Sequence, residues 1–121
     1  MIKKLENFYV SEKCPVRTVL DRIGDKWSML VMLVLGQNET LRFNEVHKSL
    51  GDISQKMLTV TLRTLEADGL VKRTAYPEIP PRVEYQLTER GETLIPHIHG
   101  LAGWANENMP AITKSRKKFA Q

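Results

Sequence analysis

Between residues 40 and 88 the spacing of apolar positions changes from a helical to a strand period, and this region gives the clearest structural prediction of the chain. Apolar side chains at intervals of three and four residues predict a short amphipathic helix over 43–50. Gly51 comes next as a helix stop, and Ser54 offers a side-chain oxygen that can cap a second helix. We expect this second helix to cover 54–68, so the sequence predicts a helix-turn-helix.

The predicted second helix has two unlike faces. Leu58, Leu62 and Leu65 share one side. At about 100° per residue a mostly polar set lies on the opposite side, with Gln55 exposed in the first turn. The members of this set are Lys56, Thr59, Val60, Arg63 and Thr64. A solvated surface accounts for a polar face on any single helix, so the role of this face depends on the neighbouring segments of the chain.

The next segments alternate between apolar and polar residues and predict a β-hairpin from strands over 70–76 and 82–87. Three prolines between them cannot donate to a strand ladder and therefore mark a stiff tip. The hairpin adds Lys72, Arg73 and Arg82. A helix-turn-helix followed by a cationic hairpin is the order of a winged helix, in which phosphate contacts position the protein and one helix reads the bases of DNA.

The flanking segments predict further helices, so the fold class is mainly α with a small β-wing (α+β). A helix over 15–23 begins with proline, and a second, apolar nearly all round, follows Asp25 as the expected centre of the core. A short strand over 40–42 can pair with the hairpin. The last helix should start near 88 and run to about Met109, with Pro96 kinking it or displacing its start.

The last predicted helix carries an apolar stripe that a winged-helix core does not require. Its members are Leu94, Ile98, Leu101 and Trp104. The stripe favours a dimer interface, while burial against the same chain stays open as the alternative.

Length and composition indicate one domain over 1–121 with a basic surface. The 121 residues carry a net charge of +4, which favours a polyanionic partner. Part of this charge lies in 114–118, either an irregular solubilising tail or a further contact for nucleic acid. We find no apolar run long enough for a membrane span and no signal core in 1–13. With a single cysteine, Cys14, we expect a cytoplasmic protein without membrane association or an intrachain disulfide.

The sequence offers no constellation typical of an enzyme or a metal protein. His97 and His99 would point about 200° apart on a helix and cannot share an ion. No nucleophile motif or glycine-rich phosphate loop occurs. We therefore expect no catalytic activity, metal or cofactor. Trp27 and Trp104 could line an effector pocket, but tryptophan at helical spacing more commonly belongs to a core.

Several motifs resemble, in residues and in order, the HxlR family of bacterial winged-helix transcription regulators, which is related in architecture to the MarR group. The motifs are Cys14-Pro15, Asp25-Lys26-Trp27, Leu41-Arg42-Phe43, Ile53-Ser54-Gln55-Lys56-Met57-Leu58-Thr59, Leu62-Arg63-Thr64-Leu65-Glu66, Gly69-Leu70-Val71, Pro80-Pro81-Arg82-Val83-Glu84-Tyr85 and Leu87-Thr88-Glu89-Arg90-Gly91. The resemblance implies a recognition helix over 54–67 and a wing over 76–82. It also implies a homodimer in which terminal helices, about 1–23 and 88–109, form the interface.

The resemblance also concerns Cys14, because some members of the family sense electrophiles or oxidants through a cysteine at this place. The helix N-terminus and the flanking Lys13 and Arg17 would favour the thiolate. A buried cysteine that packs as a small apolar side chain would instead be inert. With one cysteine per chain, the chemistry is limited to an intersubunit disulfide, a mixed disulfide with a small thiol, or alkylation.

These features predict a homodimeric, sequence-specific transcription regulator that binds double-stranded DNA at pseudo-palindromic operators. The first turns of the recognition helix would reach base edges, while arginines would hold phosphates or enter the minor groove. The predicted DNA-binding residues are Ser54, Gln55, Lys56, Thr59, Arg63, Arg73 and Arg82. Two alternatives stay open, namely a winged-helix module for protein assembly and a regulator that responds to a small ligand without redox sensing.

Overall fold

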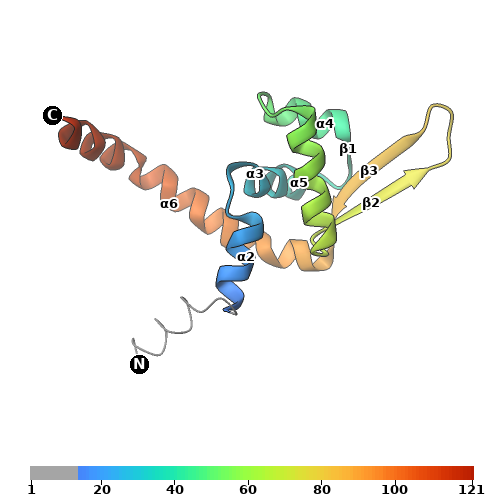
Figure 1. Ribbon diagram of the computed structural model, residues 1–121, viewed down its shortest axis with the longest axis horizontal. Helices are drawn as coiled ribbons and strands as arrows, with labels where there is room; N and C mark the ends of the chain where they lie inside the picture. The colour runs from blue at the N-terminus through green and yellow to red at the C-terminus, as the bar shows by residue number, and fades with distance from the viewer. Residues whose placement is uncertain (1–13) are drawn as a thin grey trace.

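The computed structural model describes residues 14–121, which form five helices and a three-stranded sheet (Figure 1). The helices are α2 (Pro15–Ile23), α3 (Lys26–Gly36), α4 (Phe43–Leu50), α5 (Gln55–Ala67) and α6 (Glu89–Ala120), and the strands are β1 (Leu41–Arg42), β2 (Val71–Tyr76) and β3 (Arg82–Leu87). This mainly helical fold with a small sheet confirms the predicted class. The part of the expected terminal interface that falls on 1–13 lies outside the described residues.

Capping side chains fix where the central helices begin. The Asp25 carboxylate accepts hydrogen bonds from the backbone N–H groups of Trp27 and Ser28, at 3.2 and 3.3 Å, and starts α3. Ser54 Oγ accepts one from the Met57 N–H at 3.0 Å and starts α5. Gly51 has φ +82° after α4, a conformation that residues with a Cβ rarely adopt. The predicted helix-turn-helix is therefore confirmed to within a residue at each boundary.

The sheet is antiparallel with the order β1-β3-β2, so β1 pairs with the hairpin as the sequence predicted. Leu41 lies opposite Tyr85, and Val71 lies opposite Leu87. The outer half of the hairpin extends from the body of the protein, and α6 extends in the opposite direction (Figure 1). The sheet thus fixes the hairpin beside the C-terminal part of α5.

Helix α3 occupies the centre of the hydrophobic core. Val31, Met32 and Leu35 are fully buried, which confirms the role predicted for this apolar helix. Helices α4, α5 and α6 and strand β3 all contact α3. The core therefore packs against the leucine face of α5 and leaves the opposite face of this helix accessible.

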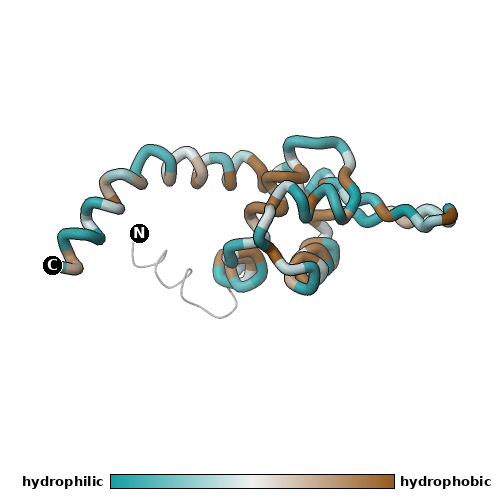
Figure 2. Tube along the Cα trace, turned by 90° about the horizontal axis from the view of Figure 1, so that it is seen from above, coloured by the Kyte–Doolittle hydropathy of each residue, from teal (hydrophilic) through white to brown (hydrophobic). Residues whose placement is uncertain are grey.

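The prediction that the last helix ends near Met109 was wrong, because α6 continues through Pro110 to Ala120. A proline removes one backbone hydrogen bond, and a helix can accommodate its ring by bending. The residues after Pro110 are mostly good helix formers, and Figure 2 shows that α6 curves along its length. The tail over 114–118 is accordingly helical, so the alternative of an irregular tail was also wrong. Pro96 does not displace the start, since Thr88 Oγ1 accepts from the Gly91 N–H at 3.0 Å.

Within residues 14–121, every helix is either too short or too polar to cross a lipid bilayer.

Candidate nucleic-acid interface

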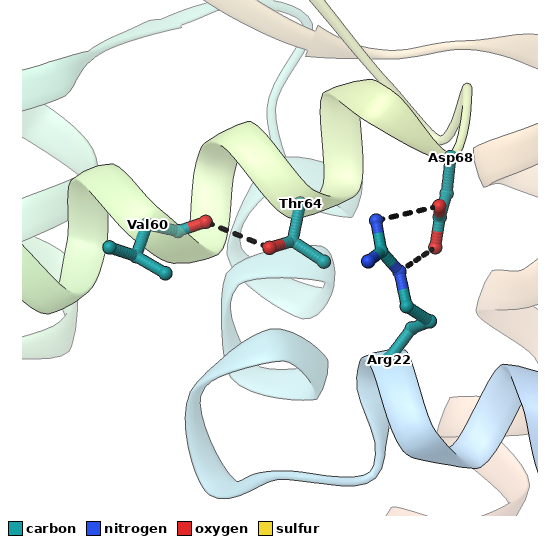
Figure 3. A network of polar contacts seen from close by, with 4 residues as sticks. All are labelled: Arg22, Val60, Thr64 and Asp68. Carbon is teal, nitrogen blue, oxygen red and sulfur yellow. Dashed lines mark hydrogen bonds and ion pairs between the residues drawn. The ribbon is translucent and has the colours of Figure 1, made fainter.

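Helix α5 separates its core-facing and outward-facing side chains as its sequence predicted. Leu58, Leu62 and Leu65 are fully buried, while four residues of the predicted polar face are exposed. The exposed residues are Lys56, Thr59, Val60 and Arg63. Two threonine hydroxyls on this side donate to backbone carbonyls one turn earlier: Thr59 to Gln55 at 2.9 Å, and Thr64 to Val60 at 3.0 Å (Figure 3). These hydroxyl oxygens can still accept hydrogen bonds.

The turn between α4 and α5 is held by polar contacts. His47 Nε2 lies 2.7 Å from the carbonyl oxygen of Ile53, which ties the end of α4 to the residue before the Ser54 cap. At the other end of α4, Glu45 Oε1 accepts from the Arg42 N–H at 2.8 Å. The His47–Ile53 contact thus holds the turn between the two helices, and the Arg42–Glu45 hydrogen bond caps the start of α4. His47, which the sequence associated with no function, has a structural contact in this turn.

Three of the predicted DNA-binding residues line one cleft between α5 and the hairpin. The cleft has a volume of about 370 Å³. Its lining residues are Thr59, Leu62, Arg63, Glu66, Arg73 and Tyr85. The predicted sites on the helix and on β2 therefore belong to one continuous surface.

The cations on this surface are available for a polyanion. Within the described part of the chain, Lys56, Arg63 and Arg73 form no ion pair. Glu66 is the acidic residue that lines the same cleft. The surface thus carries excess positive charge, which unpaired side chains can direct toward phosphates.

Arg82 is placed differently from the other predicted cations. Its Nε lies 3.1 Å from Glu78 Oε2, and its Nη1 lies 3.4 Å from Glu84 Oε2. The Nε–H has no aligned acceptor, so the interaction with Glu78 is Coulombic rather than a hydrogen bond. The guanidinium also stacks on Tyr76, 4.0 Å from the ring centroid. Two carboxylates therefore already compensate the charge of Arg82 within the wing.

Two exposed apolar side chains of α5 were not among the predicted DNA-binding residues. Met57 and Val60 are both exposed, although large apolar side chains are usually buried in a helix of a small domain. The angular position of Val60, on the side opposite the leucines, was visible in the sequence. Exposed methyl groups on a DNA-reading helix suit the C5-methyl group of thymine.

A family model described as HxlR-like helix-turn-helix matches residues 22–113. The chain belongs to the HxlR family. It is 38% identical over 110 residues to YtfH of Escherichia coli strain K12, an HTH-type transcriptional regulator, with 91% of this chain and 86% of YtfH covered. This family member is accordingly a transcriptional regulator of the helix-turn-helix type.

Two solved structures of similar regulators share the fold of this HxlR-family chain. The transcriptional regulator ytfH from Salmonella typhimurium has a TM-score of 0.79 and 37% identity, covering 88% of this chain and 95% of that one. The redox regulator HypR in its reduced form has a TM-score of 0.77 and 41% identity, covering 83% and 98%. The winged-helix fold of these two structures therefore matches most of this chain.

The apolar stripe of this HxlR-family chain divides along α6. Ile98 is buried in the core and Leu94 packs against it, whereas Leu101 and Trp104 are exposed. Helix α2 exposes apolar side chains as well, at Val16, Val19 and Leu20. An apolar groove between the two helices is lined by residues of both, including Leu20, Ile98 and Leu101. The inner half of the stripe is thus buried against the same chain, and its outer half is accessible within the described part of the chain.

Cys14 lies at the N-terminus of α2 and is 2% exposed. Its side chain forms no capping hydrogen bond, while its carbonyl oxygen accepts from the N–H and the hydroxyl of Thr18 at 3.1 and 3.2 Å. A reagent must therefore displace neighbouring groups before it reaches the sulfur.

Proposed function

We propose that this HxlR-family protein binds double-stranded DNA as a homodimer, with α5 in the major groove and the β2–β3 hairpin beside the phosphate backbone. The observation that carries the proposal is the shared cleft at which Arg63 of α5 meets Arg73 of β2, both without ion pairs in the described residues. Backbone contacts from a helix and a wing fix the position of a protein on the duplex.

The N-terminal turns of α5 supply the sequence-reading groups in this proposal. Gln55, Lys56 and Thr59 offer donors and acceptors to base edges, and Val60 offers methyl groups to thymine. Ser54 keeps its cap with the Met57 N–H, and its hydroxyl hydrogen can still donate to a phosphate oxygen. Arg63 and Arg73 hold phosphates on the two sides of the cleft.

In this proposal Arg82 contributes less to DNA binding than the sequence predicted. Glu78 and Glu84 already compensate most of the positive charge that the guanidinium would offer to a phosphate. The ion pairs and the stacking on Tyr76 are better suited to hold the shape of the wing.

The dimer in this proposal is formed by the exposed apolar faces of α2 and α6. Two copies related by a two-fold axis would cover Val16, Leu20, Leu101 and Trp104, which otherwise face water in residues 14–121. The same symmetry requires two DNA half-sites separated by about 10 base pairs or a multiple of this distance.

DNA selection combined with footprinting tests this function. Genomic fragments recovered by the purified protein should contain pseudo-palindromic sites with two protected half-sites. A single asymmetric footprint made by a monomer would contradict the proposed dimer. If no fragment is enriched over the background and salt scarcely affects partner binding, the protein is instead a winged-helix module for protein assembly.

We further propose that Cys14, which is 2% exposed, makes the regulator responsive to oxidants that reach its thiol when α2 opens locally. Two observations support this: the similarity to HypR, named a redox regulator, and the place of Cys14 on α2, a helix of the proposed interface. Oxidation that joins Cys14 to its counterpart or to a small thiol would alter the packing of α2. The test is DNA binding by wild-type and Cys14→Ser protein with and without diamide, which oxidises thiols to disulfides. If the variant releases DNA under diamide as the wild type does, Cys14 is not the switch.

A further inference from the structure

A pocket of about 570 Å³ lies between α2, the C-terminal end of α5 and the first turns of α6. Val19, Ile23, Leu70 and Leu94 provide most of its apolar wall. Its volume lies within the range of about 300–1,000 Å³ that is usual for small-molecule sites. Nothing in the proposed DNA contacts or dimer contacts requires such a cavity.

The polar groups of this pocket carry excess positive charge. Arg22, Asp68, Arg90 and His97 all line it. Arg90 forms no ion pair within residues 14–121, and its guanidinium lies so close to Gly69 that a Cβ there would meet Nη1 at 2.5 Å. Two arginines here face one carboxylate, and Arg90, which is exposed at the pocket, has no carboxylate partner in the described residues.

The contact between Arg22 and Asp68 shows how a carboxylate binds in this pocket. Nε and Nη2 of Arg22 donate to the two oxygens of Asp68 at 3.1 and 3.0 Å, forming a bidentate pair (Figure 3). These hydrogen bonds, with the Coulombic attraction, raise the pKa of the Arg22 guanidinium above its ordinary value. Planar bidentate pairing of this kind is the geometry by which arginine recognises carboxylates.

We propose that the pocket binds a small carboxylate with an apolar body, which lies against the apolar wall while the carboxylate contacts Arg90 and Arg22. A cationic ligand would meet like charge from Arg90. A neutral apolar ligand would cover Arg90 without giving it an acceptor, which costs free energy. An anion with an apolar body can pack against the apolar wall and pair with Arg90.

Ligand binding in this pocket would affect the recognition helix α5 through Asp68. Asp68 is the C-terminal cap of α5, and Arg22 connects it to α2. Val19 and Ile23 line both this pocket and the apolar groove of the proposed dimer face. A bound carboxylate competes with Asp68 for Arg22 and loosens the connection between α2 and α5. This consequence for DNA rests on the proposed function, whereas ligand binding itself does not.

The test is calorimetric titration of 2-naphthoate, with 2-naphthamide as the neutral control of the same shape, into the purified full chain without DNA. We expect naphthoate to bind at least about tenfold more tightly than naphthamide, since a hydrogen bond to a charged group is typically worth a factor of ten or more. Equal affinities for the two compounds, or no binding of either, would overturn the proposal.

Three variants distinguish ligand binding from a structural effect. Arg90→Gln should weaken naphthoate binding about tenfold, and Arg90→Lys should restore part of it. Asp68→Asn should tighten binding, because it frees Arg22 from its competitor. Arg116→Gln, the same change near the far end of α6, should have no effect. Weaker binding in Asp68→Asn, or unchanged binding in Arg90→Gln, would contradict the site, and circular dichroism verifies that each variant is folded.

A second readout separates failure of the pocket from failure of the proposed function. If naphthoate binds, saturating naphthoate should weaken DNA binding, and DNA should weaken naphthoate binding by the same factor. Naphthoate binding without any change in DNA affinity would retain the pocket and overturn the coupling through Asp68. DNA binding without naphthoate binding would overturn the pocket and leave the proposed function intact.

Discussion

Replacement of Trp104 by glutamate should dissociate the proposed dimer. Trp104 is 56% exposed in the single chain. A tryptophan presents roughly 200 Å² of surface, so burying this exposed part removes on the order of 100 Å² from water. At about 25 cal/mol per Å² the gain is about 2.5–3 kcal/mol for each protomer. Because the two-fold axis repeats the contact, the dimer gains about twice this free energy.

Losing even half of this free energy of dimerisation would raise the dimer dissociation constant about a hundredfold, since about 1.4 kcal/mol changes the constant tenfold. We therefore expect Trp104→Glu to raise the constant by at least about a hundredfold in sedimentation equilibrium. His99→Glu is the matched control, because His99 lies about 140° around the same helix. An equally tight dimer in Trp104→Glu, with the melting temperature unchanged, would refute the assignment of the stripe.

Three further predictions concern the wing, the thiol and the core. Arg82→Ala should weaken DNA binding by a smaller factor than Arg73→Ala in fluorescence anisotropy, because two carboxylates already neutralise Arg82. Cys14→Ser should bind DNA as the wild type does and keep it bound under diamide, as gel-shift assays can show. Leu62 is 1% exposed, so Leu62→Ala should lower the free energy of unfolding in urea by about 2–5 kcal/mol; a loss below about 1 kcal/mol would contradict its place in the core.

The helix-turn-helix could be predicted from the sequence because its signals are local. Ser54 accepts a hydrogen bond from an N–H group three residues away, and the leucine spacing of α5 identifies its buried face. The Asp25 cap of α3 is equally local, because it accepts from N–H groups two and three residues away. The alternation in the hairpin identified its strands in the same way. Boundaries set by such short-range hydrogen bonds and periodicities agree with the structure.

The end of α6 was not predicted correctly, because the helix continues through Pro110 to Ala120 instead of ending near Met109. The compensation of Arg82 depends on glutamates four residues before and two residues after it, which the hairpin brings into contact. The pair of Arg22 and Asp68 joins residues 46 positions apart, so the pocket beside it depends on tertiary packing. A contact of this kind, which depends on tertiary packing, cannot be recognised from the spacing of residues along the chain.

The salt dependence of DNA binding tests the central claim most directly. The double variant Lys56→Glu, Arg63→Glu is compared with the wild type and with Lys114→Glu, Lys118→Glu, which makes the same charge change near the far end of α6. Each lost phosphate contact lowers the slope of log affinity against log salt by about 0.9. Because the proposed dimer places Arg63 on a phosphate twice, we expect the first variant, folded as judged by circular dichroism, to lose at least about 1.8 from the slope, and the second to keep the wild-type slope. Equal slopes and affinities for the wild type and the first variant would contradict a DNA interface on α5.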